Sequence, residues 1–111
     1  MDVRDLTSGR VLAPDAREAR GFFGRGIGLS FRRSIPGGGL VIRPCSSIHM
    51  AFMRFPIDVV FFDRDLTVTK VARGVRPWIG FAFGGRGAAG VLEIPAGGAR
   101  DTDIGHVLAF E

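Results

Sequence analysis

The chain of 111 residues is long enough for one hydrophobic core, and we expect residues 1–111 to form a single domain. Hydrophobic residues make up 46% of it and charged residues 23%, which is typical of a soluble globular protein and excludes a disordered one. No run of about 18 apolar residues exists, so we expect no membrane span. The polar N-terminus and the single cysteine predict a cytoplasmic protein.

The net charge of +4 comes from the N-terminal part of the chain. Residues 1–43 contain eight Arg and four acidic residues, whereas residues 44–111 contain seven bases and seven acids. Such a segment can bind polyanions. Because acids are interleaved with the bases, we interpret it as a solvated surface and do not expect it to bind nucleic acid. The residues of the alternative, a weak polyanion site, would be Arg17, Arg20, Arg25, Arg32 and Arg33.

The first third of the chain predicts an arm, one helix and a loop. Residues 1–13 should form a strand or arm, in which Val3 and Leu6 offer little apolar anchoring. The order P-D-A-R-E that follows resembles a capping box and predicts a short helix over residues 16–24. Glycines limit its length, and P-G-G-G at residues 36–39 predicts a loop. The helix would bury Ala19, Phe22 and Phe23.

The rest of the chain has the composition and period of strands. The segment 57–62 is apolar on both faces, as in a strand buried on both sides, and predicts a hairpin with 67–73 around the turn 63–66. The glycine-rich segment 79–90 predicts a mobile loop, and 96–103 a loop or a single helical turn. Further strands are predicted over residues 39–43, 48–55, 90–94 and 105–110.

One motif carries a family resemblance. The runs C-S-S-I-H and F-M-R-F-P-I-D-V-V-F, with G-L-V-I upstream and P-W and V-L-E-I-P-A-G downstream, resemble the family named domain of unknown function 192 over about residues 15–110. The resemblance implies a jelly-roll-like β-sandwich from a bacterial and archaeal family without an established activity, whose members are often exported. Two positions depart from the family, which usually has Gly at Leu66 and Asp at His106.

Cys45 and His49, with Met50 and Met53 nearby, are the first candidate site. Thiolate, imidazole and thioether could bind a soft metal. On an extended strand, however, positions 45 and 49 lie about 13 Å apart, too far for a shared ion, so we expect no metal and no cofactor. A Cys–His nucleophile is the enzymatic alternative, and it would need contact between the two side chains and a lowered thiol pKa.

Arg54, Asp58 and Glu93 are charges within apolar segments, and burying them unpaired would be unfavourable. An Arg54–Asp58 or Arg–Glu93 ion pair would satisfy them. Alternatively, they form the polar floor of a ligand pocket flanked by Trp78. Trp78 itself could cap the core or stack on a ligand such as a sugar or base. The segment 80–87 has the composition of Phe/Gly/Arg tails that bind RNA, but equally that of an ordinary loop.

We therefore predict a mainly β protein, a small jelly-roll-like sandwich or barrel with one short helix near the N-terminus. It would be a small non-enzymatic ligand-binding or accessory domain with a polar cleft near His49, Arg54, Trp78 and residues 79–90. The partner would be a small molecule or a protein, and exposed edge strands leave a homodimer possible. The candidate ligand-binding residues are Cys45, His49, Arg54, Asp58, Trp78 and Glu93.

Overall fold

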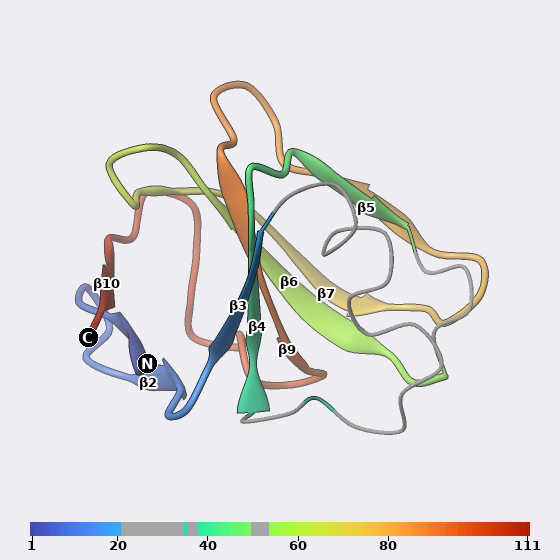
Figure 1. Cartoon of the computed structure of the whole chain (residues 1–111), viewed down its shortest axis with the longest axis horizontal. Coiled ribbons are helices and arrows are strands. Elements are labelled where there is room, and N and C mark those ends of the chain that lie inside the picture. Colours follow the sequence, from blue (N-terminus) through green and yellow to red (C-terminus); the bar gives the residue numbers. More distant parts are fainter. Residues whose placement is uncertain (21–34, 36–37, 50–53) are drawn as a thin grey trace.

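The computed structural model describes residues 1–20, 35, 38–49 and 54–111, with the side chains of residues 19, 20 and 49 outside this description. The described residues form ten strands and no α-helix (Figure 1), which confirms the predicted mainly β fold. None of these segments therefore has the long apolar helix that a membrane crossing requires. The strands are β1 (Val3–Asp5), β2 (Val11–Ala13), β3 (Arg17–Arg20), β4 (Leu40–Arg43), β5 (Ser47–His49), β6 (Ile57–Phe62), β7 (Val68–Val75), β8 (Phe81–Phe83), β9 (Gly90–Pro95) and β10 (Leu108–Phe110).

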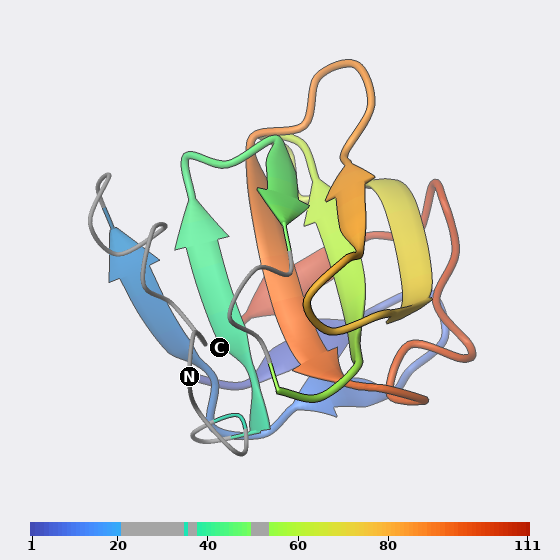
Figure 2. The same ribbon diagram turned by 90° about the vertical axis from the view of Figure 1, so that its right-hand side faces the viewer.

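The strands form one central sheet with a smaller sheet on each face. The central sheet has five strands in the order β3-β4-β9-β6-β7, in which β3 and β4 are parallel and the other pairs are antiparallel. A three-stranded sheet, β10-β1-β2, packs on one face and the pair β5-β8 on the other (Figure 2). The sheets are open rather than closed into a barrel.

Strand β6 lies between two hydrophobic cores, as its sequence predicted. All six of its residues are buried. Val59 and Phe61 enter the core under β5 and β8, here called core 1, whereas Val60 and Phe62 enter the core under β1, β2 and β10, called core 2. Alternate side chains of a strand point to opposite faces, so a strand between two cores must be apolar throughout. Burying each Phe side chain stabilises the fold by roughly 1.5–3 kcal/mol.

The predicted hairpin of β6 and β7 is also present. Asp63 begins its turn by accepting hydrogen bonds at Oδ1 from the backbone N–H groups of Asp65 (2.9 Å) and Thr67 (3.0 Å). Leu66 has φ 64, in the left-handed region that favours glycine. The turn thus keeps a glycine-like conformation at the position where the sequence has leucine.

The predicted helix over residues 16–24 is wrong for its described part, because residues 17–20 form β3; residues 21–24 lie outside the described residues. The backbone of β3 pairs with β4, and the Arg17 N–H donates to the Gly39 carbonyl at 3.0 Å. Glu18 accepts two hydrogen bonds from the Arg43 guanidinium, at 2.7 and 3.1 Å. Sheet pairing and this ion pair outweigh a weak capping signal.

Other predicted elements shift in extent. Val3 is fully buried in core 2, so the prediction that it gives little anchoring is wrong. The strand predicted over 48–55 begins at Ser47, its middle lies outside the described residues, and positions 54 and 55 are not in a strand. The last strand begins at Leu108. The predicted loop 79–90 contains β8, which pairs with β5 because alternation of Phe81, Ala82 and Phe83 buries Ala82.

Candidate functional site

The central sheet separates two of the predicted polar residues. Asp58 pairs with Ile94, a residue of core 2, whereas Glu93 pairs with Val59, a residue of core 1. Paired residues of neighbouring strands share a face of the sheet. The carboxylates of Asp58 and Glu93 therefore point to opposite faces, and they do not line a common polar floor.

The buried Asp58 carboxylate holds three segments of backbone together. Its Oδ1 accepts a hydrogen bond from the Gly74 N–H at 2.8 Å, and its Oδ2 accepts from the N–H groups of Gly97 and Ala99, both at 3.0 Å. Backbone donors thus satisfy the charge, in place of the expected pair with Arg54, whose side chain is exposed. Asp58 connects β6 to β7 and to the turn after β9.

Glu93 is a buried carboxylate in an apolar setting. Its side chain on β9 lies between Leu40 of β4 and Val59 of β6, and it is only 6% exposed. Burial raises the pKa of Glu93 to about 7. Within the described residues it has no hydrogen bond or ion pair, so the expected Arg–Glu93 pair does not occur there. Glu93 is a candidate for proton-dependent behaviour.

Cys45 is buried at the edge of core 1 and lies next to a shallow groove. The groove has a volume of about 670 Å³ and is lined by residues 44–46, 63–65 and 87–89. The Cys45 thiol donates to the Ser47 carbonyl at 3.1 Å. This hydrogen bond favours the thiol over the thiolate, which is the nucleophilic form. The side chain of His49 lies outside the described part, so contact between Cys45 and His49 stays a prediction.

Trp78 belongs to an exposed aromatic surface that the sequence only partly indicated. It lies in the turn between β7 and β8 with φ 70, and its side chain is 53% exposed. Phe81 and Phe83 are 63% and 62% exposed, and their ring centroids are 5.3 Å apart. Ile79 is exposed as well. We call these four side chains, Trp78, Ile79, Phe81 and Phe83, the β8 surface.

The β8 surface arises from the pleat of a short strand. Ala82 points into core 1 and is 7% exposed, so the residues on either side of it must point outward. Register places Phe81 opposite His49 and Phe83 opposite Ser47 on β5. The predicted positions Trp78 and His49 therefore lie at one end of β8. Phe81 and Phe83 were missed as site residues because a glycine-rich composition favoured a loop over a strand.

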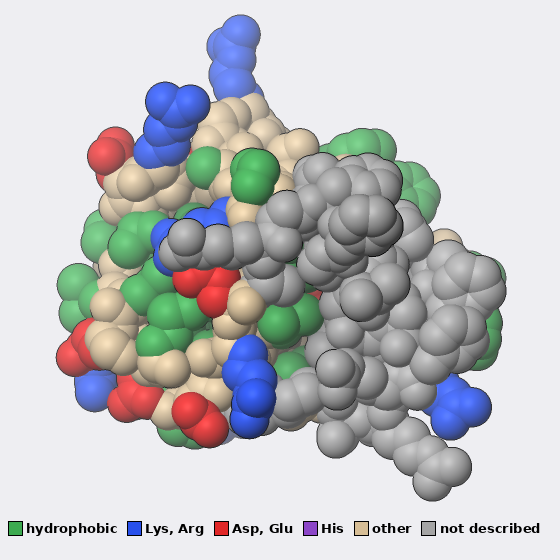
Figure 3. Space-filling view, in the orientation of Figure 1, with side chains coloured by type: hydrophobic (Ala, Val, Ile, Leu, Met, Phe, Trp, Pro, Cys, Tyr) green, Lys and Arg blue, Asp and Glu red, His purple; other side chains and the backbone are tan. Residues whose placement is uncertain are grey.

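Cations, and no acids, accompany these rings in the sequence. Residues 66–92 contain Lys70, Arg73, Arg76 and Arg86 and not one Asp or Glu. In the space-filling view, basic side chains project from the upper loops of the molecule (Figure 3). One acidic side chain also lies at the upper left of this face, and acidic and basic side chains lie together at its lower left. Residues 66–92, which include β8, therefore carry positive charges alone.

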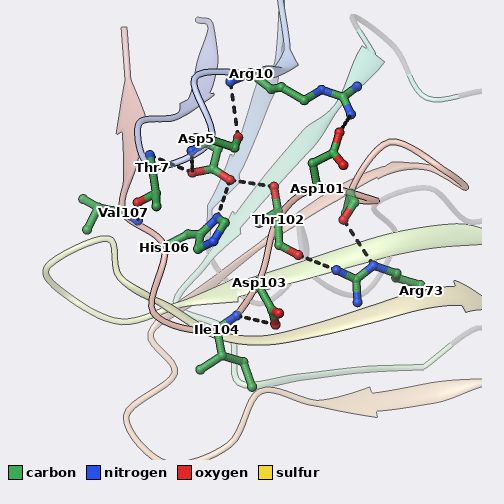
Figure 4. A network of polar contacts seen from close by, with 12 residues as sticks. Asp5, Thr7, Arg10, Arg73, Asp101, Thr102, Asp103, Ile104, His106 and Val107 are labelled. Carbon is green, nitrogen blue, oxygen red and sulfur yellow. Dashed lines mark hydrogen bonds and ion pairs between the residues drawn. The ribbon is translucent and has the colours of Figure 1, made fainter.

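A second polar cluster, which sequence reasoning missed, is built around Asp5 (Figure 4). The fully buried Asp5 carboxylate accepts from Thr102 Oγ1 at 2.9 Å, from His106 Nδ1 at 2.8 Å and from the backbone N–H groups of Thr7 and Ser8. Burial opposes ionisation, but these hydrogen bonds outweigh it and lower the pKa of Asp5. The ionised carboxylate fixes the His106 ring.

The Asp5–His106 arrangement resembles the orienting half of a catalytic triad, yet the hydroxyls around it have other bonds. Thr7 Oγ1 accepts from the Val107 N–H at 3.1 Å, and Ser8 Oγ accepts from the Arg10 N–H at 3.3 Å. The cluster therefore joins β1 to the segment before β10. No local signal could have found it, because Asp5 and His106 lie 101 residues apart. The described residues also contain no group of three or more potential metal ligands.

Comparison with solved structures supports the fold. A protein of unknown function from Novosphingobium aromaticivorans matches with a TM-score of 0.84 and 24% identity, over 98% of this chain and 82% of that one. A proposed transcription regulator from Sinorhizobium meliloti matches with a TM-score of 0.83 and 22% identity, over 97% and 89% of the two chains. At such identities the likeness concerns the fold alone.

Sequence comparison gives the family. An archaeal relative, the UPF0127 protein of Thermococcus sibiricus, is 34% identical over 112 aligned positions, which cover 95% of this chain and 71% of the relative. Residues 4–109 match the model of the DUF192 family, which is described as "Uncharacterized ACR". The chain therefore belongs to the DUF192 family of uncharacterised proteins, as its central motif indicated.

Proposed function

We propose that this chain is a small non-enzymatic binding or accessory domain and that the β8 surface is its recognition site. The observation that carries the proposal is the exposure of Phe81 and Phe83 on β8 and of Trp78 in the turn before it. Large apolar side chains gathered on one exposed patch are typical of a binding site rather than of an inert surface. Aromatic rings bring a large contact area with few rotatable bonds, and they are enriched where proteins bind partners.

The β8 surface includes Trp78 and part of residues 79–90, two of the positions near which the sequence predicted a polar cleft together with His49 and Arg54. The chemistry of the β8 surface differs from that of the predicted cleft, because aromatic rings are found where polar side chains were expected. Asp58 is engaged with three backbone N–H groups, and Glu93 faces the interior. The enzymatic alternative has less support, since the Cys45 thiol is buried and donates a hydrogen bond to the Ser47 carbonyl.

Binding of 1-anilinonaphthalene-8-sulfonate tests this proposal, because this probe combines aromatic rings with a negative charge and fluoresces on apolar surfaces. We expect the folded protein to enhance its fluorescence, and the double variant F81S/F83S to lose most of the enhancement. I104S is the matched control, since Ile104 is 64% exposed in the turn before β10. Equal fluorescence of the wild type and F81S/F83S, with both folded by circular dichroism, would overturn the proposal.

A further inference from the structure

We infer that the β8 surface binds single-stranded nucleic acid, an inference that rests on the proposed function of this surface. Proteins that bind single strands combine exposed aromatic rings, on which bases stack, with cations that contact the phosphates. Both features are present around β8. The rings are Trp78, Phe81 and Phe83, and the cations lie before, beside and after the strand.

Two of the three rings, Phe81 and Phe83, stand on one strand, and they pack edge to face with centroids 5.3 Å apart and an interplanar angle of 81°. Phe81 and Phe83 are two residues apart on the same side of β8, which corresponds to about 7 Å along a strand. Aromatic residues placed in this way on a sheet stack two or three unpaired bases in other single-strand-binding domains.

The cations surround this strand on three sides. The Arg76 carbonyl accepts from the Gly80 N–H at 3.0 Å, so exposed Arg76 lies at the start of β8. Exposed Arg86 follows the end of β8 in the turn before β9. Exposed Lys70 is on β7, whose Thr69 hydroxyl donates to the Gly84 carbonyl at 2.7 Å, and Figure 2 shows β7 and β8 side by side.

Arg73 is left out of the proposed site. Its guanidinium donates to the carbonyl of Ala99 at 3.2 Å and to that of Thr102, which directs it toward the turn after β9. The groove beside Cys45 is left out too, because Asp63 and Asp65 line it and would repel phosphate. The N-terminal arginines, which are interleaved with acids, play no part in this inference.

The composition of the surface favours bases over sugars. Carbohydrates are usually bound by stacking together with amide and carboxylate side chains that hydrogen-bond their hydroxyls. This chain contains no Asn and no Gln, and residues 66–92 contain no Asp and no Glu. Base stacking needs no such partner, since every base has a π-face.

The test is fluorescence anisotropy with fluorescein-labelled oligothymidine of about 15 nucleotides, within the range of site sizes of single-strand-binding domains. Binding should weaken with salt. In F81S/F83S we expect the affinity to fall on the order of 10-fold or more per lost ring. The slope of the logarithm of the binding constant against the logarithm of the salt concentration, here called the salt slope, should stay unchanged. In R76S/R86S the salt slope should decrease in magnitude by about 1.4, because each phosphate contact contributes about 0.7.

A charge-matched control is R4S/R100S, which removes two arginines from the β1 side of the molecule and should leave the slope unchanged. The same loss in R4S/R100S and R76S/R86S would indicate diffuse attraction and overturn the assignment. So would an unchanged affinity of folded F81S/F83S. If oligothymidine fails to bind at low salt while the sulfonate probe still binds at β8, the binding surface stands and its partner is an apolar protein segment or an anionic membrane; phosphatidylserine vesicles distinguish these two.

Discussion

Glu93 couples the stability of the protein to pH. Burial raises its pKa from 4.5 to about 7. Below pH 4.5 the carboxyl is protonated in both the folded and the unfolded chain. Between pH 4.5 and 7 the unfolded chain releases this proton while the folded chain retains it, so the free energy of unfolding falls as pH rises. Above pH 7 the ionised Glu93 lowers the free energy of unfolding by its full amount, on the order of 3 kcal/mol.

Substituting Glu93→Gln should remove this pH dependence. The variant keeps the shape of the side chain without its ionisation, so its free energy of unfolding should decrease less between pH 5 and pH 8 than that of the wild type, by on the order of 3 kcal/mol. Urea unfolding at the two pH values measures the difference. Glu111→Gln, at an exposed carboxylate, should behave as the wild type. An identical pH dependence in E93Q and the wild type would show that Glu93 does not titrate as expected.

Asp58→Asn should destabilise the protein at neutral pH. The carboxylate accepts three backbone N–H groups with its two oxygens, whereas an amide has one oxygen and an NH₂ group that would face donors. At least one buried N–H would lose its partner, which costs about 2 kcal/mol or more. The urea midpoint measures this. Asp103→Asn is the control, because Asp103 is exposed and its carboxylate accepts from the N–H of the neighbouring Ile104; equal midpoints for the two variants would contradict the prediction.

The sequence identified Asp58 as a buried charge, because it interrupts an apolar run. It could not identify the partners, which lie 16, 39 and 41 residues away and contribute only backbone groups. Any residue type can supply a backbone N–H, so no composition signal marks these positions. Val3 gives the opposite case, since a single apolar residue in a polar segment carries no pattern, and only the packing of β1 on core 2 shows that it is buried.

At the scale of elements, long strands with neighbours in sequence were predictable and short edge elements were not. The sequence of the β6–β7 hairpin has an apolar run, then a turn signal, and then a second segment rich in β-branched residues. β3 and β8 have three or four residues each, and they exist because a partner strand supplies hydrogen bonds. Local propensity is weak over such lengths, so tertiary pairing decides their structure.

The edge strand β3 should be held by the pair of Glu18 and Arg43. The two side chains make two hydrogen bonds and are partly buried, and this bidentate geometry raises the pKa of Arg43. In a double-mutant cycle of E18A and R43A, we expect a coupling energy of about 1 kcal/mol in unfolding experiments. The cycle is needed because Arg43 also lies over the Phe110 ring, 5.0 Å from its centroid.

The exposed pair of Arg100 and Asp101 provides the control for this cycle. Its atoms are 3.8 Å apart, and the side chains are 71% and 55% exposed. Solvent screening should reduce its coupling energy to nearly zero. Equal coupling in both cycles would mean that the Glu18–Arg43 pair does not hold β3 to β4.

At the scale of the whole molecule, the central sheet belongs to both hydrophobic cores. β6 sends Val59 and Phe61 into core 1 and Val60 and Phe62 into core 2, and β9 alternates in the same way. Neither core can lose its central strands while the other keeps them. The three layers should therefore unfold together as one domain, which the length of the chain also predicted.

Val3→Ala tests whether the three layers unfold cooperatively. Val3 is fully buried in core 2, whereas Trp78 lies in the turn before β8, on the far side of the central sheet. Removing two buried methyl groups should cost about 2 kcal/mol. Trp78 is the only tryptophan, so its fluorescence follows the β8 side, whereas far-ultraviolet circular dichroism follows all strands. In urea, we expect V3A to shift both transitions to the same lower midpoint. If the layers unfolded independently, the dichroism transition would shift and the Trp78 transition would keep its wild-type midpoint, and the chain would then contain two cooperative units instead of one.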